Sequence, residues 1–172
     1  MAHSIRLRGP WEYQPLARYQ LLPDGCLQKV TNDLPPGGTL DLPADWGPAL
    51  GQDFQGIVRF SRRFHCPTGL DAHSRVWLVL EDVDASASID LNDRFLGRAV
   101  FSRLPESAKP DNGQWQRCPA RFEITGDLRP LNQLSITVSS LIAAPDDSRP
   151  YAGPGDERKP GGLIGLVQLE IE

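Results

Sequence analysis

Hydrophobic and polar residues alternate through most of this chain in short segments that are separated by turns. Residues 76–80 are apolar on one parity and mostly apolar on the other, which predicts a central strand of a packed sheet. Residues 86–91 alternate between apolar and polar side chains, which predicts a strand with one face in water. Asn92 and Asp93 follow, and both residue types tolerate a positive φ, so they can close a two-residue hairpin into Phe95 and Leu96.

The same alternation predicts further strands along the rest of the chain. We expect them at residues 5–7, 13–19, 39–42, 57–66, 122–125, 134–138 and 163–171. Residues 44–56 and 143–162 have no sustained period and are expected to be loops, and no segment predicts a helix of ten residues. Short strands spaced by turns indicate an all-β fold, a jelly-roll β-sandwich whose first and last strands can pair.

One cation interrupts this pattern. Arg62 falls on the apolar parity of the strand at 57–66, among Val58, Phe60 and Phe64. A charged side chain at such a position predicts either a β-bulge or a buried, paired guanidinium.

Composition narrows the classes of partner. The 172 residues predict a single domain, 1–172, and the net charge of −4 without a basic run argues against nucleic acid and anionic membrane surfaces as partners. Cys26, Cys66 and Cys118 form an odd set without CxxC spacing, so free thiols in a reducing compartment are expected. The N-terminus has no apolar signal region, which favours a cytoplasmic location.

Acidic residues offer only weak signals for catalysis or metal binding. Asp82 and Asp84 share one face at the end of a strand, and with Asp90 nearby they could form a structural calcium site. Solvated carboxylates near a sheet edge are the stronger interpretation, and no other cofactor is indicated. No pair among the 22 acids is singled out by spacing as the carboxylates of a glycoside hydrolase, and we expect no catalytic residues.

Aromatic residues outside the strand patterns are more informative. Sugars stack on aromatic faces and need hydrogen-bonding side chains around them, and the two long loops combine both. A saccharide site is therefore expected from Asp45, Trp46, Asp53, Arg149, Tyr151 and Arg158. The alternative is that Trp46 and Phe54 are buried and close one end of the sandwich.

Several blocks together resemble the N-terminal sugar-binding domain of glycoside hydrolase family 2, the β-galactosidase and β-glucuronidase group. The matching blocks, in the family's order, are residues 42–47, 56–64, 76–80, 83–84, 87, 91–92, 96–97, 122–125, 128, 132–134, 138, 161–164 and 167–169. Two departures are Asn92-Asp93 in place of Asn-Gly, and Gly165-Leu166 where many members carry a polar pair.

The resemblance implies a galactose-binding-like jelly roll. Enzymes of this family carry their catalytic glutamates on a separate (β/α)₈ barrel, so the resemblance implies no glycosidase activity for this chain alone. It points to a non-catalytic carbohydrate-binding module with a saccharide as partner. The alternative is a protein-interaction module, or an accessory subunit or fragment of a glycoside hydrolase.

Overall fold

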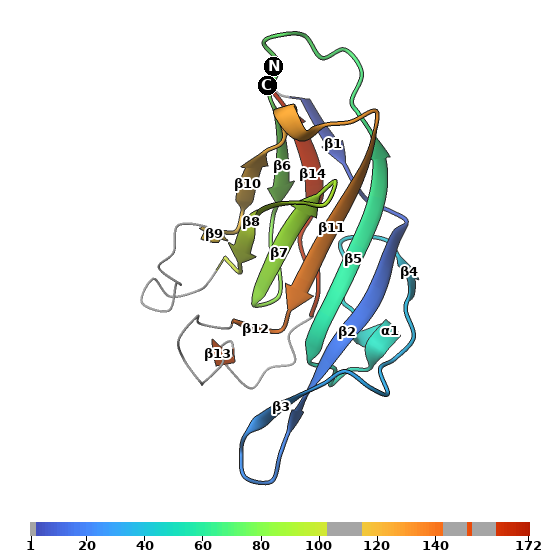
Figure 1. Ribbon diagram of the computed structural model, residues 1–172, viewed down its shortest axis with the longest axis vertical. Helices are drawn as coiled ribbons and strands as arrows, with labels where there is room; N and C mark the ends of the chain where they lie inside the picture. The colour runs from blue at the N-terminus through green and yellow to red at the C-terminus, as the bar shows by residue number, and fades with distance from the viewer. Residues whose placement is uncertain (1–2, 103–114, 143–150, 153–160) are drawn as a thin grey trace.

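The computed structural model describes residues 3–102, 115–142, 151–152 and 161–172, which form two facing β-sheets (Figure 1). The smaller sheet has the order β1-β14-β6-β10. Its strands are β1 (His3–Arg6), β14 (Val167–Ile171), β6 (Val76–Leu80) and β10 (Ala120–Glu123). The first and last strands pair antiparallel, with His3 opposite Ile171, so the expected pairing of the chain's ends is confirmed.

The larger sheet has the order β3-β2-β5-β11-β7-β8-β9, and β4 also pairs with β2. Its strands are β2 (Trp11–Leu21), β3 (Leu27–Val30), β4 (Gly38–Leu40), β5 (Gly56–His65), β7 (Ser86–Leu91), β8 (Arg94–Val100), β9 (Trp115–Arg117) and β11 (Leu131–Ser139). Short elements complete the description: α1 (Gly47–Leu50), a 3-10 turn η2 (Thr125–Asp127), and the paired strands β12 (Leu141–Ile142) and β13 (Tyr151–Ala152).

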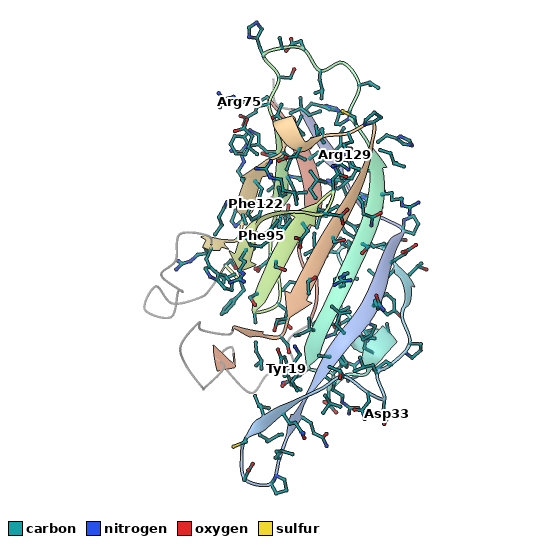
Figure 2. All side chains as sticks on the ribbon, in the orientation of Figure 1. Tyr19, Asp33, Arg75, Phe95, Phe122 and Arg129 are labelled. Carbon is teal, nitrogen blue, oxygen red and sulfur yellow. The ribbon has the colours of Figure 1, made fainter. Side chains whose placement is uncertain are left out.

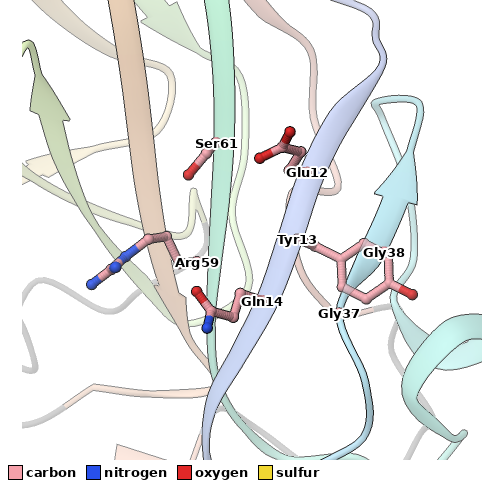
Figure 3. A pocket seen from close by; sticks show the side chains of 7 residues that line it. All are labelled: Glu12, Tyr13, Gln14, Gly37, Gly38, Arg59 and Ser61. Carbon is pink, nitrogen blue, oxygen red and sulfur yellow. The ribbon is translucent and has the colours of Figure 1, made fainter.

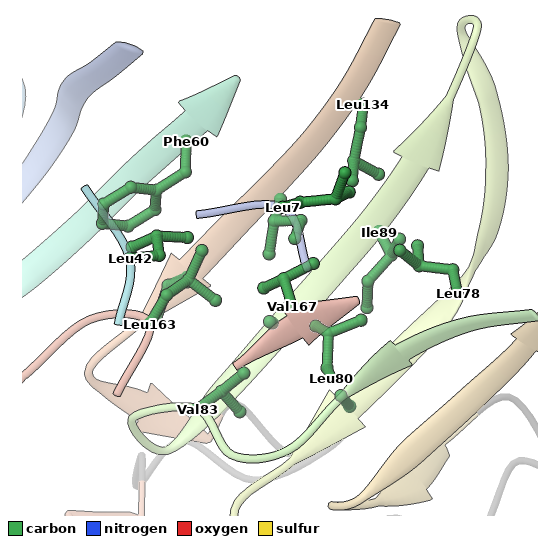
Figure 4. Packing of buried hydrophobic residues seen from close by; sticks show 14 of the residues in the cluster. Leu7, Leu42, Phe60, Leu78, Leu80, Val83, Ile89, Leu134, Leu163 and Val167 are labelled. Carbon is green, nitrogen blue, oxygen red and sulfur yellow. The ribbon is translucent and has the colours of Figure 1, made fainter. Parts of the chain in front are cut away.

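The hydrophobic core lies between the two sheets, as Figure 4 shows. Phe60, Ile89 and Leu134 come from the larger sheet, and Leu78 and Leu80 come from the smaller one; all five are at most 1% exposed. These residues occupy the alternate apolar positions of strands β5, β7, β11 and β6. The alternation in the sequence therefore identified the faces that pack together. The all-β sandwich is confirmed. Within the described residues no helix has the length and apolar character needed to span a bilayer.

The hairpin between β7 and β8 also matches the expectation. Asn92 and Asp93 form the two-residue turn with φ values of 53° and 67°. Two successive left-handed residues belong to a type I′ turn, whose twist suits the flanking strands. The side chain of Asn92 donates to the carbonyl of Asp127 at 2.9 Å and accepts from the Gln133 backbone at 2.9 Å, which fixes the hairpin tip to β11.

Arg62 is partly buried, but not in the way the sequence predicts. The pairing of β5 with β11 runs through Arg62 opposite Leu134 without a shift, so there is no bulge at this position. Nε and Nη1 of Arg62 are buried and have no hydrogen-bond partner among the residues that the structure describes. Burial lowers the pKa of Arg62, while the nearby charge of Asp41 opposes that shift. The bulge on this side of the sheet lies instead in β2, between Pro15 and Ala17.

Several expected boundaries differ from those in the structure by a few residues, and two differences have a clear physical reason. The segment 44–56, expected to be a loop, contains α1, in which Gly51 N–H donates to the Gly47 carbonyl at 2.8 Å and Pro48 occupies the first turn. The last strand begins at Val167 rather than Leu163. A β-carbon on Gly165 would lie 2.3 Å from the backbone nitrogen of Asp82, so the chain lies very close to the residues that follow β6.

Candidate functional site

The loop that carries Asp45 and Trp46 is tied to the segment just before the last strand. Asp45 is exposed, and its Oδ1 accepts hydrogen bonds from the backbone N–H of Gly47 at 2.8 Å and of Gly161 at 3.2 Å. The backbone N–H of Trp46 donates to the carbonyl of Gly161 at 3.1 Å, and the backbone N–H of Ala44 donates to the carbonyl of Leu163 at 3.1 Å. The Asp45 carboxylate thus stabilises the connection between two distant segments.

Trp46 is a core residue, which corrects the expectation that it stacks on a sugar. It is 3% exposed, and its indole lies parallel to the ring of Phe60 and edge-on to that of Phe54. The opposite side is closed by Gly161, where an added β-carbon would lie 2.3 Å from Nε1, and by Gly162. No ring face remains for a ligand, so Trp46 and Phe54 close one end of the sandwich, as the alternative interpretation has it.

The structure brings few of the other expected sugar-binding residues together. Asp53 is exposed at the end of the loop after α1. Tyr151 lies in β13, opposite Ile142, but only its backbone is described. Arg149 and Arg158 lie outside the described residues. The expected loop site therefore loses Trp46 as a stacking platform, and Asp45 and Asp53 are its exposed side chains among those described.

The three acids considered for calcium do not converge. Asp82 accepts hydrogen bonds from both the backbone N–H and the hydroxyl of Ser102, each at 3.0 Å, so its carboxylate caps the turn after β8. Asp90 lies in β7 of the other sheet, apart from Asp84, which follows β6. No group of three His, Cys, Asp or Glu side chains able to hold a metal occurs in the part of the chain that the structure describes.

A polar surface covers the outer face of the larger sheet, and sequence reasoning did not identify it as a site. One row of directly opposed residues runs across four strands: Glu12 in β2, Ser61 in β5, Ser135 in β11 and Asp90 in β7. In the sequence pattern these side chains appear only as the polar, solvent-facing positions of each strand. Strand order and register were needed to show that they are neighbours.

A hollow of about 370 Å³ lies at one side of this surface, over β2 and β5 (Figure 3). Its lining residues are Glu12, Tyr13, Gln14, Gly37, Gly38, Arg59 and Ser61. A β-carbon on Gly37 would lie 2.6 Å from the Tyr13 carbonyl oxygen, and one on Gly38 would lie 2.8 Å from the Tyr13 hydroxyl. The two glycines therefore let the chain before β4 lie against Tyr13 and form one wall of the hollow.

The polar side chains of this hollow have spare hydrogen-bonding capacity. Among the described residues, the side chains of Glu12, Gln14 and Arg59 have no hydrogen-bond or ion-pair partner, and all three are exposed. Ser61 lies 3.5 Å from the hydroxyl of Ser135, at the limit for a hydrogen bond. The hollow thus offers a cation, an anion, an amide and a hydroxyl to a ligand.

A second hollow, of about 300 Å³, differs in this respect. It is lined by Arg63, Asn92, Asp93, Arg129, Leu131, Asn132 and Gln133. Arg63 Nε donates to Gln133 Oε1 at 3.0 Å, and Asn132 donates to the Arg129 carbonyl at 2.8 Å and accepts from Asn92 at 3.0 Å. Four of its six polar side chains thus bond to one another and hold the corner before β11 in place, and only those of Asp93 and Arg129 have no partner among the described residues.

The charge of Arg59 extends beyond the hollow to Asp90. Burial raises the pKa of Asp90, the positive charge of Arg59 lowers it, and the negative charge of Asp93 raises it again. Arg59 and Asp90 lie on strands either side of β11, where Ser135 and Thr137 are short. Opposite charges thus face each other across the middle of the sheet.

Solved structures share the fold of this chain. A β-glucuronidase from Bifidobacterium dentium is similar with a TM-score of 0.67 at 17% identity, covering 99% of this chain and 30% of that one. A GH2 β-galacturonidase from Eisenbergiella tayi gives 0.60 at 17% identity over 99% and 24%, and a rhamnosidase from Novosphingobium gives 0.61 at 20% over 100% and 15%. No protein-family model matches the sequence, and no curated protein is significantly similar to it.

These likenesses have one feature in common. Each covers nearly all of this chain, while the chain spans between 15% and 30% of the length of these enzymes. The chain therefore has the fold of a domain that makes up a minor part of larger glycoside-cleaving enzymes.

Proposed function

We propose that this chain is a non-catalytic carbohydrate-binding domain of the kind that accompanies the catalytic domain in family 2 glycoside hydrolases. The observation that carries the proposal is the coverage: the whole chain is similar to a minor part of enzymes that act on glycosides. The outer face of the larger sheet supports it, because Glu12, Gln14 and Arg59, which have no partner among the described residues, can both donate to and accept from sugar hydroxyls.

Binding to a glycan array, followed by calorimetric titration of the best ligand, tests this function. We expect measurable saccharide binding and no hydrolysis of nitrophenyl glycosides by the same preparation. Turnover that persists after a second purification would contradict the non-catalytic part of the proposal. Failure to bind any glycan on the array would contradict the carbohydrate-binding part.

A protein-interaction module is a second candidate because of the arm formed by β3 and the end of β2. This arm projects from the body beyond Tyr19 (Figures 1 and 2). Leu21 and Leu27 are opposite each other on it and are 68% and 37% exposed. Exposed apolar pairs of this kind favour contact with another protein surface. A partner that binds the protein but not its Leu21→Ser variant would support this function.

A further inference from the structure

We propose that the hollow formed by Glu12, Gln14, Arg59 and Ser61 is the saccharide site, and that it takes an uncharged sugar unit. This inference rests on the proposed carbohydrate-binding function and adds to it a location and a ligand class. Neither follows from the sequence, in which the aromatic and polar residues of the two long loops predicted a site around Trp46.

The location follows from a comparison of the two hollows. Ligand sites combine a concave shape with a few convergent polar groups, and about 370 Å³ falls within the usual range for such sites. Four of the six polar side chains of the second hollow are hydrogen-bonded to one another, which leaves Asp93 and Arg129, whereas Glu12, Gln14 and Arg59 of the first hollow have no partner among the described residues. A ligand in the first hollow can therefore form hydrogen bonds with Glu12, Gln14 and Arg59 without breaking any that these side chains already make.

The strand pairing makes this set of groups rigid at the backbone. Glu12 is opposite Ser61, which is the first pair of the ladder that joins β2 to β5, and Gln14 is opposite Arg59, two pairs further along and before the bulge. Strand β5 is paired on its other side with β11 over nine residue pairs, from Leu131 opposite His65 to Ser139 opposite Ile57. Groups carried on such strands keep their spacing when a ligand binds, which reduces the entropy cost of binding.

Charge determines the class of sugar. Glu12 is an anion and Arg59 a cation within the same hollow, and Asp90 adds a second anion near Arg59. An acidic sugar would meet Glu12 and Asp90 as well as Arg59, so attraction and repulsion would offset each other. The hydroxyl groups of an uncharged sugar can donate to Glu12 and accept from Arg59 at once, and so use both charges.

The test uses single variants with a matched control on the same strand. Arg59→Ala and Glu12→Gln remove one charged partner each, and each should weaken binding of a neutral oligosaccharide at least tenfold, because hydrogen bonds to charged groups are strong. Arg63→Ala, also exposed on the outer face of β5 but in the second hollow, should change affinity less than twofold. Circular dichroism and thermal melting of each variant control for folding.

A second readout separates the inference from the function on which it rests. Titration of the ¹⁵N-labelled wild-type chain with the best glycan should shift the backbone amides of residues 12–14, 37–38 and 59–61. Glycan binding that leaves these amides and the Arg59→Ala affinity unchanged would overturn the location while the proposed function stands. Binding of acidic glycans alone would overturn the ligand class. Absence of all glycan binding would overturn both the inference and the function.

Discussion

The indole of Trp46 lies parallel to the ring of Phe60, with an interplanar angle of 5° and ring centroids 6.4 Å apart. This contact joins a loop to the middle of β5 and makes the loop part of the core. It depends on a close approach from the other side, because Gly161 and Gly162 cover the indole. The end of the sandwich is thus closed by one tryptophan held between a phenylalanine and two glycines.

Gly161→Ala should destabilise the protein. The added methyl group would lie 2.3 Å from Trp46 Nε1, so the indole or the backbone must move. Overpacking of this kind costs about 1–3 kcal/mol, which should appear in the free energy of unfolding measured by urea titration. Gly126→Ala is the matched control, because nothing lies within 4 Å of its added β-carbon. Equal stability of the two variants would show that the indole has room to move.

Asp93→Gly should stabilise the β7–β8 hairpin. Asp93 has a φ of 67°, which glycine adopts without a steric penalty. We expect a gain of about 0.5–1 kcal/mol once the greater freedom of glycine in the unfolded chain is subtracted. Asn92→Gly should have the opposite effect despite its similar φ of 53°, because it removes the hydrogen bonds of Asn92 to Asp127 and Gln133. Loss of stability in Asp93→Gly would contradict this account of the turn.

Asp90→Asn should raise the melting temperature at neutral pH. Burial raises the pKa of Asp90 in the native state, so the folded protein holds that proton more tightly than the unfolded chain does. Stability from this group is therefore present below about pH 4, the ordinary aspartate range, and is lost as the pH rises through the raised pKa. The advantage of the variant should shrink as the pH is lowered toward 4 in a series of thermal melts.

Asp71→Asn is the control of opposite sign for that series. Hydrogen bonds from the Ser74 hydroxyl and from the backbone of His73 lower the pKa of Asp71. Its contribution to stability is present at neutral pH and is lost as the pH falls through the lowered value. The variant should therefore melt lower than wild type at pH 7. The same direction of change for both variants would argue against these assignments.

The three thiols should differ in reactivity. None of Cys26, Cys66 and Cys118 is in a disulfide; Cys26 is exposed, Cys66 is partly buried and Cys118 is buried. Burial, with the nearby charge of Asp82, raises the pKa of Cys118 to about 12, so it carries almost no thiolate at pH 8. We expect a thiol reagent to label Cys26 first and Cys118 only after unfolding. Cys26→Ser should abolish the fast phase, as peptide mass mapping can verify.

The sheet architecture was predictable from local alternation. Strand β6 is apolar on both parities and is central in the smaller sheet, and the turn at Asn92 and Asp93 has the positive φ values that its residue types favour. Such features depend on neighbours in sequence, and sequence contains that information directly.

The environment of Trp46 and the polar hollow were not predictable in the same way. Trp46 is covered by Gly161, and the hollow joins Glu12 to Arg59 through the register of β2 and β5. Both depend on contacts between segments far apart in the chain. Since a shift of register by one residue would reverse every side chain of a strand, hydropathy alone cannot tell which polar residues become neighbours.

The adjacency of β1 and β14 has a consequence for the way this fold can be connected. Directly opposed residues of antiparallel strands lie about 4.5–5.5 Å apart at their Cα atoms, and His3 is opposite Ile171. A short peptide could join the two ends, and new ends could be opened at the exposed turn around Asp24 and Gly25. Such a circularly permuted chain would keep every strand neighbour. Because β1 and β14 lie side by side, the same sandwich could also be inserted into a loop of a host protein.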